Sequence, residues 1–383
     1  MEPFKNLLNP ALVAASAAQL RRHWRGFDAA TFTAQACDGL EALEMKARAM
    51  QICSALEATL PADFDRAAGL LESALAPMLN DEVAGASGPQ EGLQQGLQGW
   101  VLWPVGEYIA RHGQAQPERA LAALHALTQR FTAEFAIRPF IVQHPALCWA
   151  TLQRWTADPS AHVRRLVSEG SRPRLPWGLR LQALVQDPSP TLPLLQALQD
   201  DGSEYVRRSV ANHLNDIAKD HPALVVGWLQ QHLPAAPAPR RALLKHASRT
   251  LVKQGHAPTL QAWGLGLGFE GQATLKLAPA QVRLGQAVQL TLQLQCAAAG
   301  PGDAQPLVVD YAVHHVKADG STRPKVFKGW QLQLSPGGSV TLHKQHSMRP
   351  VTTRRYHPGL HAITVQVNGR EVAAASFVLL DGD

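Results

Sequence analysis

The stretch 200–222 has the hydrophobic pattern of one amphipathic helix. At 100° per residue its apolar residues fall on one stripe, whereas Arg208, Asn212 and Asp216 recur at i, i+4 and i+8 on the opposite side. A core does not need these three side chains. They form either a solvated helix face with weak cross-turn pairs or a surface that binds a partner. The apolar stripe consists of Val206, Val210, Leu214 and Ile217.

The period of the pattern changes once along the chain. Residues 1–264 repeat with the helical period of 3.6 and are broken by turn signals, which predicts an all-α domain. After the glycine-rich stretch "GLGLGFEG", residues 268–383 alternate with period 2 between turns such as "ADGS", "SPGG" and "VNGR". This favours a disulfide-free immunoglobulin-like β-sandwich, in which Tyr356 would supply a tyrosine corner.

An internal repeat refines the helical half. The stretches "DPSAHVRRLV" and "DGSEYVRRSV" share the pattern D-x-S-x-x-V-R-R-x-V and begin 43 positions apart, at Asp158 and Asp201. Paired helices that repeat every 40–47 residues are typical of HEAT and armadillo proteins. The sequence therefore predicts a HEAT-like solenoid followed by a β-sandwich, with aspartate and serine at the helix N-caps and the valines in the core.

Composition and charge add a class of partner. Of 383 residues, 46% are hydrophobic and 17% charged, as in globular proteins, and the net charge of +6 favours a polyanion such as nucleic acid. Four widely spaced cysteines predict neither a disulfide framework nor a zinc site. No stretch reads as a signal peptide or a membrane span, so we expect a cytoplasmic, membrane-free chain.

Several longer stretches resemble the AlkC branch of the AlkC/AlkD family of DNA glycosylases. They are "MEPFKNLLNP", "FTAEFAIRPFI", "HPALCWATLQRWTADPSAHVRRLVSEGSRPRLPWG" and "YVRRSVANHLNDIAKDHP". The resemblance covers essentially the whole helical half, and the β half resembles the immunoglobulin-like extension of one AlkC subgroup. It implies a monomeric, metal-free and cofactor-free enzyme that removes N-alkylated bases, especially 3-methyladenine and 3-methylcytosine, from double-stranded DNA.

The resemblance also assigns a site. Glu134, Glu169, Asp216 and Trp177 would line the lesion, with the carboxylates stabilising the sugar cation and the indole packing against the nucleotide. Such a reaction needs carboxylates, because positive charge develops on the deoxyribose as the glycosidic bond stretches. The residues alone leave other roles open: Glu134 and Arg138 could form a plain helix pair, and Trp177 could pack in a turn.

Basic residues supply the expected DNA contacts. Arg164, Arg165, Arg172, Arg174 and Arg180 cluster around a single acid, and Arg208 lies beside Asp216 on the same helix. In the β half, a second patch would include Lys325, Lys328, Arg349, Arg354 and Arg355. Phosphate binding explains the arginine cluster better than a solvated face does, whereas the patch in the β half could equally consist of ordinary basic loops.

Other signals predict structure only. Trp149 and Trp155 have apolar helical neighbours and are expected in the core. The histidines of the pair 314–315 and of "HKQH" (343–346) lack metal-ligand partners and are expected to face solvent. Two rival functions remain open: a non-catalytic HEAT-repeat scaffold that binds DNA or protein, and a protein that binds DNA structure without removing a base.

Overall fold

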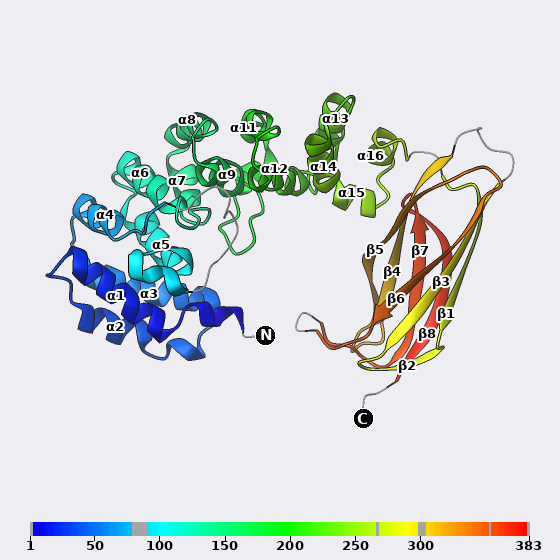
Figure 1. Ribbon diagram of the computed structural model, residues 1–383, viewed down its shortest axis with the longest axis horizontal. Helices are drawn as coiled ribbons and strands as arrows, with labels where there is room; N and C mark the ends of the chain where they lie inside the picture. The colour runs from blue at the N-terminus through cyan, green and yellow to red at the C-terminus, as the bar shows by residue number, and fades with distance from the viewer. Residues whose placement is uncertain (1–2, 79–89, 266–267, 298–303, 352–353, 381–383) are drawn as a thin grey trace. The chain divides into compact units, whose positions relative to one another are not determined.

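The structure, a computed structural model, describes residues 3–78, 90–265, 268–297, 304–351 and 354–380. Helices precede strands along the chain, which confirms the predicted fold class (Figure 1). The described helices are α1 (Pro10–His23), α2 (Ala29–Cys37), α3 (Met45–Thr59), α4 (Phe64–Ser73), α5 (Leu102–His112), α6 (Pro117–Thr128), α7 (Ile137–Gln143), α8 (Pro145–Trp155), α9 (Ala161–Gly170), α10 (Gln182–Gln186), α11 (Leu192–Leu198), α12 (Glu204–Ile217), α13 (Pro222–His232), α14 (Ala238–Ala247), α15 (Arg249–Lys253) and α16 (Ala257–Ala262).

Successive helices form a HEAT-like array. The helices α6, α8 and α11 follow one another along one side of it, with α5, α9 and α12 along the other (Figure 1). Within the second row, α12 packs against both α9 and α14, and its apolar stripe of Val206, Val210, Leu214 and Ile217 is buried as predicted. Among the described residues, no helix combines the length and the apolar character that crossing a membrane requires.

The repeated D-x-S motif builds the loops that start α9 and α12. Ser160 and Ser203 occupy the N-cap positions, but neither side chain caps the helix. Instead, the backbone N–H of each serine donates to the aspartate two residues earlier, at 2.9 Å in the first repeat and 2.8 Å in the second. This Asx turn is the common use of aspartate before a helix. The serines therefore lie at the predicted N-cap positions, while each aspartate forms the turn that precedes the helix.

The strands form two sheets of a sandwich. The smaller sheet has the order β1-β3-β6 and the larger β2-β8-β7-β4-β5; the described pairings are antiparallel except that of β2 with β8. Alternate residues fill the space between the sheets, as the period of 2 requires. The strands are β1 (Gly271–Ala278), β2 (Gln281–Arg283), β3 (Ala287–Cys296), β4 (Gln305–Val316), β5 (Thr322–Leu334), β6 (Ser339–Ser347), β7 (Gly359–Val367) and β8 (Arg370–Leu380).

The sandwich corrects the prediction for two histidines. His315 on β4 is 5% exposed and His346 on β6 is 7% exposed, so both lie inside rather than in solvent. The reason is strand register: His315 continues the inward set of Tyr311 and Val313, because side chains two apart share a face. Tyr356, the predicted tyrosine corner, packs its ring against His315 with centroids 5.4 Å apart.

Packing divides the chain differently from the helix-to-strand boundary. One compact unit comprises residues 1–221 and 235–247, and the other comprises 222–234 and 248–383, so that α13, α15 and α16 fall in the same unit as the sandwich. Within the second unit, Gly255 after α15 meets Gly369 in the β7–β8 turn. Both have positive φ, and a Cβ on Gly369 would lie 2.2 Å from the Gly255 Cα. Only glycine permits this approach.

Candidate functional site

Three carboxylates predicted for the site come together in the first unit. Glu134 lies in the turn before α7, Glu169 near the end of α9 and Asp216 near the end of α12. Arg165 lies 2.6 Å from Glu134 and 3.7 Å from Glu169, and Arg172 lies 2.6 Å from Glu169 and 2.8 Å from Asp216. Two arginines thus join three carboxylates, and we name these five residues the carboxylate chain.

The position of Asp216 differs from the prediction. It was expected on the polar side of its helix, on a face turned toward DNA, yet it is 1% exposed. It is buried because Ser209, His213 and Asp216 form a second stripe beside the apolar one, at i, i+4 and i+7, which packs against residues 168–172. Ser209 donates to Glu169 at 2.6 Å, His213 meets the Ser168 carbonyl at 2.9 Å, and Asp216 bonds Arg172.

Cations compensate the burial of these acids. Burial alone would raise the pKa of the Glu169 carboxyl, but Arg165 and Arg172 outweigh it and hold that pKa below its usual range. Glu169 also lies at a helix C-terminus, where the helix dipole disfavours an acid. Lys219 adds a further cation 2.8 Å from Asp216. Glu169 is therefore kept charged inside the protein, and each of the other two acids has a cation beside it.

Glu134 does not form the helix pair that its spacing from Arg138 allowed. It lies in a turn before α7 begins, so the i, i+4 geometry of a helix is absent at this point. Its Oε2 accepts from the Thr132 hydroxyl at 2.9 Å and pairs with Arg165. Arg138 instead donates to the backbone carbonyls of Gly170 and Leu179.

Trp177 is held on a group of aromatic rings. It lies in a turn, as predicted, with a left-handed φ of 64° and 56% of its surface exposed. Its ring stacks on Trp103 at 5.9 Å with an interplanar angle of 8°, and Trp103 in turn stacks on Phe135 at 4.8 Å. Phe4 lies 5.9 Å from Trp177. Because Phe135 follows Glu134 in the chain, the aromatic group adjoins the carboxylate chain.

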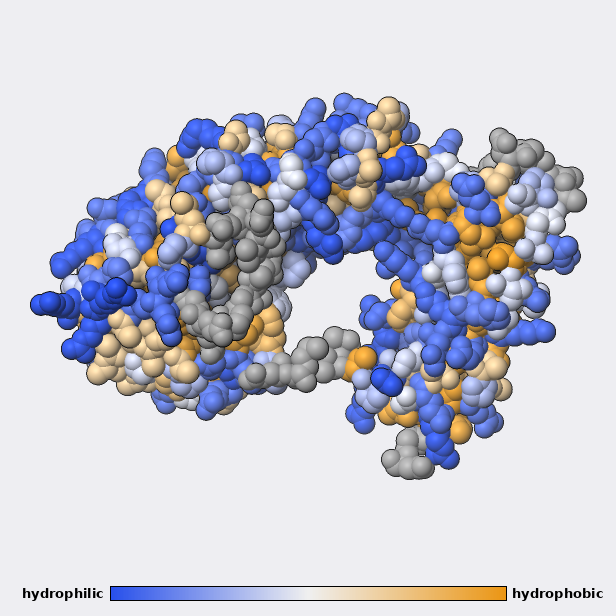
Figure 2. All heavy atoms as spheres, in the orientation of Figure 1, coloured by the Kyte–Doolittle hydropathy of each residue, from blue (hydrophilic) through white to orange (hydrophobic). Residues whose placement is uncertain are grey.

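The predicted phosphate-binding arginines are not equivalent. Arg164 binds Asp201 at 2.6 Å and donates to the Asp158 carbonyl at 2.8 Å, so it braces the repeat loops. Arg165 and Arg172 belong to the carboxylate chain. Arg174 pairs with Asp220 at 2.7 Å. Arg208 is exposed on α12, where Figure 2 shows a mainly hydrophilic surface.

The predicted basic residues of the β half lie in the second unit. Arg354, half-buried, and Arg355, exposed, fall in the segment between β6 and β7. Lys325 and Lys328 are exposed on β5, the last strand in the order of its sheet. Lys325 lies 5.4 Å from the centre of the Phe327 ring, a cation–π distance.

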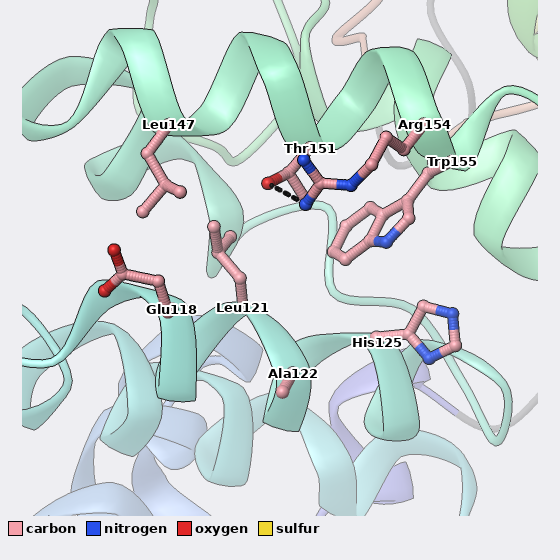
Figure 3. A pocket seen from close by; sticks show the side chains of 8 residues that line it. All are labelled: Glu118, Leu121, Ala122, His125, Leu147, Thr151, Arg154 and Trp155. Atoms are coloured by element: carbon pink, nitrogen blue, oxygen red, sulfur yellow. Dashed lines mark hydrogen bonds between the residues drawn. The ribbon is translucent and has the colours of Figure 1, made fainter.

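A pocket of about 310 Å³ lies away from the predicted site residues, between α6 and α8 (Figure 3). Trp155, expected in the core, is half-buried and forms one wall of this pocket; Trp149 is also half-buried. The pocket is lined by Glu118, Leu121, Ala122, His125, Leu147, Thr151, Arg154 and Trp155. In the part of the chain that the structure describes, no group of three acidic, histidine or cysteine side chains is arranged to hold a metal.

Sequence reasoning missed the supporting residues Ser209, His213 and Lys219. A signal for the first two was present, because a polar i, i+4, i+7 stripe beside an apolar one marks a second buried face. Burial lowers the pKa of His213 to about 4, so that its imidazole is neutral at neutral pH. Phe4 was also missed, and its contact with Trp177 joins positions too distant in sequence to be paired by periodicity.

Comparison with known proteins places the chain. Residues 272–381 match the family model described as the C-terminal Ig-like domain of uncharacterised protein YhaZ. The uncharacterized protein YhaZ of Bacillus subtilis (strain 168) is 33% identical over 376 residues, covering 96% of this chain and 97% of that protein. The solved structure of the Pseudomonas fluorescens alkylpurine DNA glycosylase AlkC, bound to DNA containing an abasic site analog, is 33% identical with a TM-score of 0.87, covering 99% of this chain and 100% of that chain. The chain therefore belongs to the AlkC branch of the AlkC/AlkD family, in the form that carries a C-terminal immunoglobulin-like domain.

Proposed function

We propose that this chain is a cytoplasmic DNA glycosylase that hydrolyses the N-glycosidic bond of cationic N-alkylated bases, such as 3-methyladenine and 3-methylcytosine, in double-stranded DNA. Its similarity to the Pseudomonas fluorescens alkylpurine DNA glycosylase supports the reaction class. The single observation that carries the proposal is the carboxylate chain, because a passive scaffold has no need of three acids gathered on two bridging arginines.

The chemistry of this hydrolysis suits the carboxylate chain. A base methylated on a ring nitrogen is already cationic, so it leaves as a neutral molecule and needs no general acid. Positive charge develops instead on the deoxyribose, as in glycosidases, and nearby carboxylates stabilise it before water attacks C1′. Fixed charges act strongly at such a site because they need not reorganise during the reaction.

Exposure separates the roles of the three acids. The side chains of Glu134, Glu169 and Asp216 are 13%, 7% and 2% exposed. Both oxygens of Glu169 and of Asp216 already accept from protein donors. Glu134 is thus the acid best able to contact the sugar or its attacking water, while Glu169 and Asp216 fix the arginines beside it.

Trp177 and the basic residues complete the proposal. The exposed indole would pack against the lesion nucleotide, supported from behind by Trp103. Arg208 would contact phosphate, together with Arg174 once it leaves Asp220. The second unit would add affinity through Arg354 and Arg355 without taking part in the chemistry.

The test uses duplex DNA with one 3-methylcytosine or 3-methyladenine, followed by alkaline cleavage at abasic sites. The wild type should release the base in single-turnover reactions, and Glu134→Gln should slow release by a factor on the order of 10²–10³. Glu118→Gln, an exposed acid on α6, is the matched control and should leave the rate unchanged. Tight DNA binding without any release would favour a scaffold or a reader of DNA structure.

A further inference from the structure

Arg138 on α7 is fully buried, although the one role that the sequence suggested for it, a helix pair with Glu134, does not require burial. Its exposed fraction is 0%, and it donates to two backbone carbonyls: Nη1 to Gly170 at 2.8 Å and Nε to Leu179 at 2.5 Å. Its Nη2 is buried without a hydrogen-bond partner among the described residues. A buried cation bound mainly to neutral carbonyls is uncommon, and such groups cluster at functional sites.

The two carbonyls flank one short loop. Gly170 ends α9, directly after Glu169, and Leu179 follows Trp177 and Gly178. One guanidinium therefore closes the loop 171–178 at its base. The aliphatic stem of Arg138 also packs there, since a Cβ on Gly178 would lie 3.3 Å from the Arg138 Cδ.

This loop carries two parts of the candidate site. Arg172 bridges Glu169 and Asp216, and Trp177 presents the exposed indole with a left-handed φ that only a few residues adopt freely. A strained residue keeps such a conformation only where its surroundings determine it. On the C-terminal side of Trp177, Arg138 holds the carbonyl of Leu179, and the carbonyl of Trp177 itself accepts from Lys46 at 3.3 Å.

The charged groups around Arg138 also link it to the candidate site. Burial and the neighbouring Arg172 lower the pKa of Arg138 to about 10, while Glu134, Glu169 and Asp216 favour its charged form. Arg138 therefore stays a cation at neutral pH. Among the hydrogen bonds described, it donates to backbone carbonyls and to none of the three carboxylates.

We propose that Arg138 is a positioning residue that ties the Trp177 loop to the end of α9 and so holds Trp177, Arg172 and Glu169 in one arrangement. The proposal rests on the proposed function only in that these three residues act on DNA. Arg138 itself would touch neither the base nor the sugar. A displacement of about 1 Å at a reacting group can lower a rate by a factor on the order of 10².

The loop itself gives a readout that is independent of catalysis. Trypsin can cut after Arg174 and Arg180, whereas Arg172 precedes proline and resists. Arg138→Met keeps the stem and removes both bonds, so cleavage after Arg174 should speed up by a factor on the order of 10 under native conditions. Arg138→Lys, which retains the charge and a donor, should give an intermediate cleavage rate.

Arg130→Met is the matched control. Arg130 also donates Nε and Nη1 to two backbone carbonyls, those of Ala76 at 2.7 Å and Ala126 at 2.9 Å, but it does not hold the Trp177 loop. Arg130→Met should lower the melting temperature without changing the rate of cleavage after Arg174 or the rate of excision. If Arg138→Met behaves like Arg130→Met, Arg138 has only a structural role and the proposal is wrong.

Excision gives the second readout, as a double-mutant cycle with Trp177→Ala. Arg138→Met should slow single-turnover excision by a factor on the order of 10² when Trp177 is present, but by less than about tenfold in the Trp177→Ala background. Equal losses in both backgrounds would overturn the link to Trp177. If the wild type excises nothing, the proposed function fails, while the cleavage assay still decides whether Arg138 holds the loop. If Arg138→Met does not fold, Arg138→Lys carries both assays.

Discussion

A buried carboxylate is tolerated in a protein only where cations and hydrogen bonds replace the water that it has lost. Asp216 meets this condition through Arg172 and Lys219, at 2.8 Å each. Its side chain is therefore part of the fold as well as of the candidate site. A substitution at Asp216 should then change stability and activity together.

We predict that Asp216→Asn slows excision by a factor on the order of 10²–10³. It should also lower the free energy of unfolding by about 2–4 kcal/mol, because the buried Arg172 keeps Glu169 but loses its second charge partner. Single-turnover rates and thermal melts of the same variant measure both effects. Asp220→Asn, whose partner Arg174 is more exposed, is the control and should change little. Excision within about twofold of wild type would remove Asp216 from the mechanism.

The sequence could propose candidate acids for the site but not the cations that lie beside them. Glu134, Glu169 and Asp216 were identified by resemblance, and the structure brings them together. Their burial depends on Arg165 and Arg172, which were expected to face phosphate. The partner of Asp216 lies 44 positions away along the chain, and periodicity within one helix cannot reveal such a pairing.

At the scale of elements, the repeat motif separates structural from exposed arginines. Arg164 and Arg207 occupy the same motif position, and each folds back onto its own Asx-turn loop. The next motif position holds Arg165 in one repeat and Arg208 in the other, and only Arg208 is exposed. Two repeats thus use one pattern for different purposes.

We predict that Arg208→Ala flattens the dependence of log K on log[salt] by about 0.9, the value for one lost phosphate contact on duplex DNA. Arg207→Ala, its neighbour and control, should lower the melting temperature without changing this slope, because its guanidinium binds loop carbonyls. Binding isotherms at several salt concentrations distinguish the two. An unchanged slope for Arg208→Ala would place its side chain away from DNA.

The histidines inside the sandwich make this element sensitive to acid. Burial, with Arg354 and Lys325 nearby, lowers the pKa of His315 to about 3 and that of His346 to about 4. His361 is buried beside His315, and Tyr311 bonds His346. Side chains alternate between the two faces of a strand, and the two histidines on β4 and the two on β6 are each an odd number of positions apart. The alternation therefore already implied that one histidine of each pair faces inward.

We predict that stability falls as pH drops from about 6.5 toward 4. The unfolded chain binds protons near the ordinary histidine pKa, whereas the folded sandwich keeps these rings neutral, so stability is fully present above that range and is lost below it. At pH 5, His315 and His346 should each have lowered the free energy of unfolding by on the order of 1–2 kcal/mol. Thermal melts at pH 7.5 and 5 measure the loss, which should shrink in His315→Phe. Melts that do not depend on pH would show that these rings are accessible to protons.

At the scale of the whole molecule, the helical and β halves were predicted from the change of period, and the family comparisons agree. The grouping of α13, α15 and α16 with the sandwich was not predictable, since it depends on contacts such as Gly255 with Gly369. A cut after residue 265 would therefore expose surfaces that the sandwich covers. Point substitutions test the second unit more cleanly than truncation does.

We predict that Arg354→Ala/Arg355→Ala weakens DNA binding and flattens the salt dependence by up to about 1.8, two contacts at 0.9 each. The single-turnover excision rate at saturating protein should not change, because the predicted acids all lie in the first unit. Arg283→Ala on β2, at the other end of the strand order, is the matched control. A lower rate at saturation would mean that the second unit takes part in the chemistry.

The contact between Gly255 and Gly369 also decides where this protein can be taken apart for engineering. A graft of the sandwich alone, beginning at the glycine-rich stretch, would separate two backbones that no other residue type allows to meet. The natural cassette for exchange among relatives is instead the sandwich with residues 222–234 and 248–265. Chimeras that swap only the strands should express poorly even when both parents are stable, and chimeras that move the entire cassette should not.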